Sequence, residues 1–301
     1  MDKSLRATEQ SIDSSFGIDT WGSVKILNAL IAGQERAIIA VKTAIPQIEK
    51  AANALSARLA MGGRLAYAGA GTSIRIAVQD GSELPATFGV AEDKIIYLIA
   101  GGRAAIFETL ADAEDDAEAG KSDTEQLNAA DTLVAIAASG RTPYTVAAAK
   151  AAKAKGVFVI SVVNNPDTPL GASGDVEIVL NSGPEVIAGS TRMGAGTAQK
   201  AALNMLSTLV HIRLGAVHDG MMVNVQAGNA KLQHRAAEMI AKISGAPLEE
   251  ASQALHRSGS VVKPAVLLCA GAADLASAQI LLEKTKGNLR LALAQLKHPQ
   301  T

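Results

Sequence analysis

The chain has 301 residues, of which 48% are hydrophobic and 19% charged, so it can bury a full core in one large domain with an appendage. Its formal net charge of −1 and its aromatic content of 3% argue against a nucleic-acid surface with base-stacking platforms. The one cysteine, Cys269, excludes an intramolecular disulfide framework. No signal peptide is recognisable, and no apolar run approaches the roughly 20 residues of a membrane-spanning helix. We therefore expect a cytoplasmic protein without membrane or nucleic-acid partners.

The first segment, residues 1–59, is expected to form an N-terminal arm and lead-in helices. Residues 1–20 are polar and mixed, without a clear period. From Gly22 to about Leu59, apolar residues recur at helical spacing, and Pro46 restarts or kinks the helix.

Residues 60–220 alternate between apolar runs and helical stretches. The runs predict five strands: Leu65–Ala68, Lys94–Ala100, Thr132–Ala138, Val157–Val163 and Val176–Leu180. The stretches between and after them predict helices over Ala104–Ala119, Tyr144–Ala154 and Thr191–Leu214. Near-continuous apolar strands separated by helices are typical of a parallel sheet covered on both faces. The sequence therefore predicts an α/β fold with a doubly wound, five-stranded parallel sheet flanked by helices.

The last segment, residues 221–301, predicts a small C-terminal helical subdomain. After a connector at 221–226, apolar periodicity indicates five short helices: Ala230–Ser244, Leu248–Ser258, Val262–Gly271, Leu275–Lys284 and Leu289–Leu296.

A glycine-rich turn follows the first predicted strand. In Gly69-Ala70-Gly71-Thr72-Ser73, glycine permits close approach of a bound group, and the hydroxyls of Thr72 and Ser73 can cap the following helix. Free N–H groups at a helix start, together with hydroxyls, favour an anion such as phosphate. An ordinary turn that binds nothing is the alternative.

A second turn of this kind follows the third predicted strand. Ser139 and Thr142 offer hydroxyls, Gly140 permits close approach, and Pro143 suits the first helical position. Because ligands of parallel sheets bind outside the carboxyl ends of the strands, two such helix starts can converge on one anion. Ordinary N-caps are the alternative here.

A third loop, after the fifth predicted strand, offers further hydroxyls, and the motifs of nucleotide-binding folds are missing. Ser190 or Thr191 can cap the helix that begins near them. The first turn has Ile74 where a dinucleotide motif has its third glycine, no acidic residue ends the second strand, and no Walker A lysine is present. A phosphorylated small molecule fits this pattern better than a nucleotide.

Two carboxylates are candidates for acid–base chemistry. Glu83 follows the first turn closely, and a surface glutamate is its alternative interpretation. Glu114 lies in an acid-rich stretch that is predicted to be helical. At about 100° per residue, Glu114 falls at the edge of the apolar stripe that contains Phe107 and Leu110. A carboxylate in partly apolar surroundings tends to have a raised pKa, which suits proton transfer. The five histidines show no metal-ligand spacing, so no metal is expected.

Five stretches resemble the N-acetylmuramic acid 6-phosphate etherases of the sugar isomerase (SIS) domain superfamily. They are GAGTS at 69–73, SELPATFGV at 82–90, IAGG at 99–102, IAASGRTPY at 136–144 and GSTRMGAGTAQKAALNMLST at 189–208. The resemblance implies a SIS-type fold, a homodimer that can use residues of both chains, and an amino-sugar phosphate as substrate.

The resemblance also implies a reaction. A base removes the C2 proton, D-lactate leaves from C3, and water adds to give N-acetylglucosamine 6-phosphate, with no metal or redox cofactor. Glu83 resembles the acid that assists lactate, and Glu114 resembles the base at C2. Gly71, Thr72, Ser73, Ser139, Gly140, Thr142, Ser190 and Thr191 are the expected substrate-binding residues.

Two departures and two alternatives accompany this resemblance. Ile74 stands where the family commonly has glycine, and Gly194 where it usually has lysine. The alternatives are a non-catalytic SIS sugar-phosphate sensor akin to glucokinase regulatory protein and an aldose–ketose isomerase. A sensor needs no carboxylate pair, and an isomerase needs no acid for a leaving group, so the presence of both acids favours the lyase.

Overall fold

The computed structural model describes residues 8, 10, 15–108, 110, 112–225 and 229–297. Contacts divide the chain into two compact units, Met1–Gly81 with Asp93–Thr208 and Ser82–Glu92 with Leu209–Thr301. The first is called the sheet unit here and the second the helical unit. The three-part division at residues 1–59, 60–220 and 221–301 stays a prediction. Among the described residues, no helix is long and apolar enough to cross a membrane.

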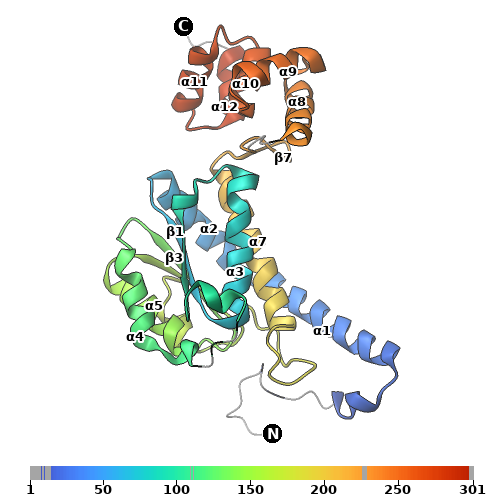
Figure 1. Cartoon of the computed structure of the whole chain (residues 1–301), viewed down its shortest axis with the longest axis vertical. Coiled ribbons are helices and arrows are strands. Elements are labelled where there is room, and N and C mark those ends of the chain that lie inside the picture. Colours follow the sequence, from blue (N-terminus) through green and yellow to red (C-terminus); the bar gives the residue numbers. More distant parts are fainter. Residues whose placement is uncertain are drawn as a thin grey trace. The chain divides into compact units, whose positions relative to one another are not determined.

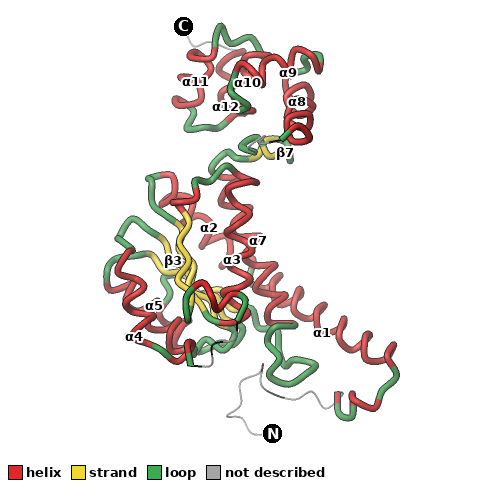
Figure 2. The backbone as a smooth tube through the Cα atoms, in the orientation of Figure 1, coloured by secondary structure: helices red, strands yellow, loops and turns green. Residues whose placement is uncertain are grey.

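The sheet unit contains the expected parallel sheet (Figures 1 and 2). Its strands are β1 (Leu65–Gly69), β2 (Ile95–Ile99), β3 (Thr132–Ala137), β4 (Phe158–Val163) and β5 (Val176–Val179). They are all parallel, in the order β2-β1-β3-β4-β5. β1 and β3 are buried along their whole length, which is why their sequences are continuous apolar runs. The fold-class prediction is confirmed.

Short helices and small side chains cover one face of this sheet. Here α5 (Pro143–Ala154) packs with α4 (Ala117–Asp123) and α6 (Pro169–Ser173). The buried cluster on this face contains the alanines of β1 and β3 together with Ala148 and Ala152 of α5. Because alanine has a short side chain, the helix can lie close to the strands.

Longer helices occupy the other side of the sheet in Figure 1. They are α2 (Ile45–Ala60), α3 (Gly71–Phe88) and α7 (Gly194–Arg213), with α1 (Ser23–Thr43) preceding them. The lead-in prediction is thus confirmed, with the break at Ala44, directly before Ile45 and Pro46.

A buried carboxylate joins three of these elements. Asp80 of α3 is 6% exposed and accepts hydrogen bonds from Tyr67 of β1 at 3.0 Å, from Asn204 of α7, and from Ser207 of α7 at 3.1 Å. Burial, and then the Asp80 charge, raise the pKa of Tyr67 well above its usual range. Since α3 starts at the first glycine-rich turn, this network fixes the position of that turn relative to the sheet.

The helix expected over Ala104–Ala119 is not formed, and this prediction is wrong. The described part of the stretch contains 3-10 turns at Arg103–Ile106 and Ala113–Asp115. The α-helix begins only at Ala117, because Asp116 has non-helical dihedral angles and its side chain accepts a hydrogen bond from Ala119 N at 2.8 Å. Aspartate competes for the backbone in this way and favours a helix start over a helix interior. Phe107, assigned to the apolar stripe, is 90% exposed.

The helical unit contains the end of α3, the end of α7 and the rest of the chain. A short antiparallel hairpin of β6 (Val217–His218) and β7 (Met221–Met222) precedes α8 (Ala230–Ser244), α9 (Leu248–Arg257), α10 (Val262–Cys269), α11 (Leu275–Lys284) and α12 (Leu289–Lys297). One core of Ile240, Leu255, Val266 and Leu267, among others, joins these helices. The five helices agree with the apolar periodicity of the sequence.

Candidate active site

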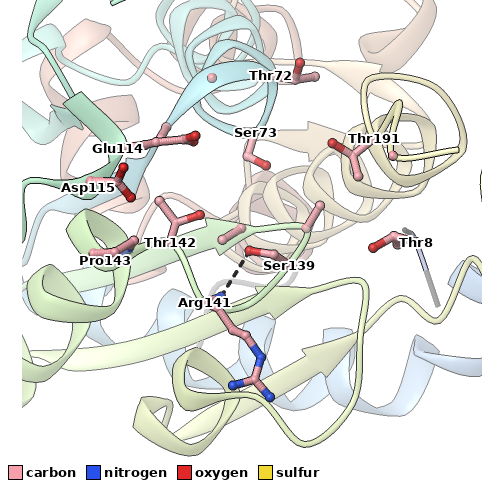
Figure 3. Close-up of a pocket in the computed structure, with 15 residues that line it drawn as sticks. Thr8, Thr72, Ser73, Glu114, Asp115, Ser139, Arg141, Thr142, Pro143 and Thr191 are labelled. Atoms are coloured by element: carbon pink, nitrogen blue, oxygen red, sulfur yellow. Dashed lines mark hydrogen bonds between the residues drawn. The ribbon is translucent and has the colours of Figure 1, made fainter. Parts of the chain in front are cut away.

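A cavity of about 380 Å³ lies at the carboxyl ends of β1 and β3 in the sheet unit (Figure 3). The residues that line it are Thr8, Ala70, Gly71, Thr72, Ser73, Glu114, Asp115, Ala137, Ala138, Ser139, Arg141, Thr142, Pro143, Gly189 and Thr191. Most polar groups in this set are hydroxyls and backbone amides, and two are carboxylates. Ligands of parallel α/β sheets bind at this edge.

The first wall of the cavity is the turn from β1 into α3. Gly71 has a φ of +52°, and an added Cβ there meets nothing within 4 Å, so glycine both permits the turn and keeps the space open. The amides at the start of a helix have no acceptor within the helix, and Ile74 N is the first in this turn to bond back, to Ala70 O. The hydroxyl of Ser73 faces the other polar groups in Figure 3. This wall offers N–H and O–H donors to an anion.

The second wall is the turn from β3 into α5. Gly140 has a φ of +64°, and a Cβ there would lie 2.3 Å from Thr168 Oγ1, so the tight turn requires glycine. Thr142 is the N-cap residue of α5, yet its side chain makes no capping hydrogen bond. Ser139 Oγ accepts a hydrogen bond from Arg141 N at 3.1 Å. The hydroxyl of Thr142 is therefore not used as an ordinary N-cap, which weakens that alternative for this turn.

Two neighbouring carboxylates form a third side of the cavity. Glu114 and Asp115 belong to the 3-10 turn Ala113–Asp115 and both line the cavity. Glu114 is exposed to solvent rather than set among apolar residues. Its inward placement comes from the irregular turn and not from the helical periodicity that predicted it. In Figure 3, both side chains lie on the side opposite Thr8 and Thr191.

The structure brings together most of the residues selected from the sequence. Gly71, Thr72, Ser73, Ser139, Thr142, Thr191 and Glu114 all line the cavity. Gly140 and Ser190 lie outside the lining, Gly140 because it forms the turn behind it. Glu83 is exposed on α3, in the part of that helix assigned to the helical unit, and does not line the cavity.

Sequence reasoning missed Thr8, Asp115, Arg141 and Gly189 as lining residues. Arg141 stands between two selected residues of the second turn, so its position in the motif was a usable signal. Its guanidinium points away from the hydroxyl groups in Figure 3. Thr8 carries no local signal, since it reaches the cavity only through tertiary contacts.

The two departures from the family pattern also lie outside the cavity. Ile74 is 1% exposed, so its side chain belongs to the core behind the turn. Gly194 N and Ala195 N donate hydrogen bonds to the buried carboxylate of Glu185, at 2.9 and 2.8 Å. This carboxylate caps α7, and its negative charge interacts favourably with the positive N-terminal end of the helix dipole. A Cβ at Gly194 would lie 3.0 Å from Glu185 Oε2.

Among the described residues, no group of three or more His, Cys, Asp or Glu side chains is arranged so that it could hold a metal ion.

Two family models identify a SIS domain in this chain. The SIS domain family model matches residues 104–209, and the model of the glucokinase regulatory protein N-terminal SIS domain matches residues 44–153. Among solved structures, the chain is similar to a phosphoheptose isomerase from Francisella tularensis (TM-score 0.48, 20% identity, 64% of this chain and 98% of that one). It is also similar to one from Neisseria gonorrhoeae (TM-score 0.47, 19% identity, 64% and 98%).

Comparison with curated proteins is more specific. The chain is 44% identical to the N-acetylmuramic acid 6-phosphate etherase of Symbiobacterium thermophilum over 89% of either chain. It is 41% identical to that of Deinococcus radiodurans over 96% of either chain. The chain belongs to the N-acetylmuramic acid 6-phosphate etherase family.

Proposed function

We propose that the protein is a carbon–oxygen lyase that cleaves the D-lactyl ether of N-acetylmuramic acid 6-phosphate. The observation that carries this proposal is the cavity. It lies in a chain that N-acetylmuramic acid 6-phosphate etherases match along nearly its whole length. Donor-rich helix starts and a carboxylate pair face one space of sugar-phosphate size. This combination suits a small anionic substrate and proton transfer on carbon.

The chemistry needs only acid–base groups. Ring opening gives an aldehyde at C1, which acidifies the C2–H bond. A base takes this proton, the C3–O bond breaks, and the lactate oxygen receives a proton from an acid. Water then adds to the C2–C3 double bond, so that the sum is ether plus water giving N-acetylglucosamine 6-phosphate and D-lactate. A positioned acid or base typically contributes roughly 10²–10⁴-fold to rate.

Glu114 is the proposed base at C2, since it lies in the cavity and resembles the family's base. Two carboxylates compete for the role of the acid. Asp115 lies beside Glu114 in the same cavity, whereas Glu83 carries the family resemblance but lies outside the lining of its own chain. Glu83 therefore reaches the substrate from a second copy of the chain in a shared site, or Asp115 takes its place.

The hydroxyls and amides of the two turns are the proposed binding site for the sugar phosphate. Ser73, Ser139 and Thr142 lie around one space in Figure 3, and the start of each following helix adds N–H donors and a favourable dipole. Thr191 contributes a further hydroxyl from the third loop.

A cytoplasmic homodimer is part of this proposal. The helix α1 exposes Val24, Leu27 and Ile31, at 73%, 63% and 54%. These positions recur at helical spacing and form an apolar stripe, which is typical of a face that another helix covers. Association with a second copy would bury it.

Release of D-lactate from N-acetylmuramic acid 6-phosphate by the purified protein tests the function. The expected result is turnover in the wild type and loss in Glu114→Gln. Glu83→Gln and Asp115→Asn identify the acid, because only the residue that protonates lactate will be needed for ether cleavage. An inactive wild type would contradict the proposal.

Mixing two inactive variants tests the shared site. If Glu83 acts across a dimer, equal amounts of Glu83→Gln and Glu114→Gln chains, unfolded and refolded together, regain about a quarter of the wild-type activity, since half the dimers carry one intact site of two. No recovery places the complete site within one chain.

A non-catalytic sugar-phosphate sensor is the second candidate, favoured by the match of residues 44–153 to the glucokinase regulatory protein SIS model. Its signature is thermal stabilisation by a sugar phosphate without lactate release. An aldose–ketose isomerase would instead interconvert hexose phosphates.

A further inference from the structure

Thr8 lies near the N-terminus, far along the sequence from the two glycine- and hydroxyl-rich turns that form the cavity. It is fully buried and lines the cavity. It contacts Asn165, which stands 157 positions later in the chain. Its backbone carbonyl accepts a hydrogen bond from Gly189 N at 3.3 Å, so it is joined to the loop that carries Thr191.

The contacts of Thr8 determine what its hydroxyl can do. Asn165 Nδ2 donates to Thr8 Oγ1 at 3.1 Å and to Ala138 O at 2.8 Å. The second bond fixes the orientation of the amide, because a backbone carbonyl only accepts hydrogen bonds. Thr8 Oγ1 is thus an acceptor toward Asn165, and its O–H hydrogen has no acceptor among the described residues.

The direction of this hydroxyl is visible in Figure 3, where it points from one side of the cavity toward Ser139. Thr191 lies on the same side as Thr8, Ser73 and Ser139 lie between, and Glu114 and Asp115 lie opposite. A phosphate dianion is repelled by the carboxylates and attracted by donors, so it occupies the end of the cavity where Thr8 lies. The carboxylates are left with the carbon atoms at the other end of the sugar.

We propose that Thr8 is a substrate-binding residue whose hydroxyl donates a hydrogen bond to the phosphate of the sugar. This inference rests on the proposed function for the identity of the sugar. It makes the N-terminal arm part of the active site: residue 8 closes the phosphate end, and Asn165 holds its hydroxyl in the donating orientation.

Thr8→Val removes the hydroxyl at nearly constant shape, and Thr8→Ser keeps it. Thr20→Val is the matched control, since Thr20 lies in the same region, is exposed and is absent from the cavity lining. The measurements are kcat and KM for lactate release and calorimetric binding of N-acetylglucosamine 6-phosphate, N-acetylglucosamine and inorganic phosphate. Thermal unfolding of each variant reports on folding.

We expect Thr8→Val to raise KM and the Kd of N-acetylglucosamine 6-phosphate about tenfold or more, as loss of a hydrogen bond to a charged group does. The Kd of N-acetylglucosamine, which lacks the phosphate, stays unchanged. Thr8→Ser restores most of the affinity, and Thr20→Val behaves as wild type. A purely structural role would lower the melting temperature and weaken both sugars alike.

Wild-type affinity for the phosphorylated sugar in Thr8→Val would overturn the inference, as would equal weakening of both sugars. If the wild type releases no lactate but binds N-acetylglucosamine 6-phosphate, the proposed function fails while the binding series still decides the role of Thr8. A wild type that binds no sugar phosphate overturns both.

Discussion

The starts of helices differ between the sheet unit's cavity and the helical unit. In the helical unit, α8 and α11 begin with Asn229 and Asp274, whose side chains accept hydrogen bonds from Leu232 N at 3.0 Å and Ser277 N at 2.7 Å. At the cavity, Thr142 is the N-cap residue of α5 but forms no such bond. Asn229 and Asp274 therefore cap their helices, whereas the hydroxyl of Thr142 at the cavity does not cap α5.

The cavity has free hydrogen-bond donors because a side-chain cap is missing at its edge. A side-chain cap typically stabilises a protein by about 1 kcal/mol, and the start of α5 forgoes that contribution. Within the sheet unit, α4 and α6 are capped by Asp116 and Thr168, whereas α1 and α2 begin at Gly22 and Ala44, which have no side chain that could cap a helix. The start of α5 differs from both groups, because Thr142 carries a hydroxyl and does not use it as a cap. Uncapped amides and hydroxyls are available to a ligand.

Substitution of Glu114 in the cavity should strongly lower activity and leave stability unchanged. Glu114→Gln should lower kcat roughly 10²–10⁴-fold, the usual contribution of a general base. Because Glu114 is exposed, the melting temperature of the Glu114→Gln variant should stay within about 1 °C of the wild-type value. Glu118→Gln, exposed and outside the lining, is the control for lost charge. Full activity of Glu114→Gln would remove the acid–base assignment.

In the helical unit, Lys263 should make stability depend on pH. Burial lowers its pKa to about 8, and its Nζ donates to Gly287 O at 2.6 Å. The folded state therefore binds fewer protons than the unfolded state, whose lysine titrates near 10.4, and stability rises with pH between these values. From pH 7 to 9.5 we expect a gain of about 2 kcal/mol in the free energy of unfolding.

Urea unfolding of the wild type, Lys263→Met and Lys284→Met over this pH range measures the effect. The Lys263→Met variant should lose the rise in stability with pH, whereas the Lys284→Met variant, changed at an exposed residue, should retain it. Parallel pH curves for the wild type and Lys263→Met would show that Lys263 is not the group responsible. Lactate release should be unaffected in both variants, because neither residue lines the cavity.

Thr142→Val should affect binding and leave folding nearly unchanged. Loss of a hydroxyl that contacts the substrate is expected to raise KM up to about tenfold. Since Thr142 makes no capping bond, the free energy of unfolding should change by less than about 0.5 kcal/mol. Thr142→Ser is the control and should keep most of the affinity. A stability loss with unchanged KM would mean that Thr142 is an ordinary cap after all.

Asn229→Ala should show the opposite behaviour with the smallest expected effect. It removes the cap of α8 and should lower the free energy of unfolding by about 1 kcal/mol, with kcat and KM for lactate release unchanged. Asn229→Asp retains an acceptor oxygen and should recover most of the loss. Chemical unfolding and the lactate assay distinguish these outcomes, and altered kinetics in Asn229→Ala would break the contrast between the units.

Regular elements of this fold are predictable because their signals are local. Each strand of the parallel sheet lies within one residue of a continuous apolar run, and Ala230–Ser244 and Leu275–Lys284 are helices as their periodicity indicates. The short hairpin of β6 and β7 was not predicted. The stretch after β2 failed for a local reason too, since a string of aspartates offers several competing helix starts. There Asp116 begins a helix where the apolar periodicity indicates its interior.

The sequence by itself determined the parallel sheet, most of its long helices, and the two glycine- and hydroxyl-rich turns at its carboxyl edge, because strand burial, helical periodicity and turn chemistry act over a few residues. Only the tertiary structure decided which side chains share the cavity. It brings Thr8 to Asn165 across 157 positions, turns Glu114 and Asp115 into the cavity from an irregular segment, and leaves Glu83 outside. Such contacts depend on packing between distant segments, for which no local pattern in the chain carries the information.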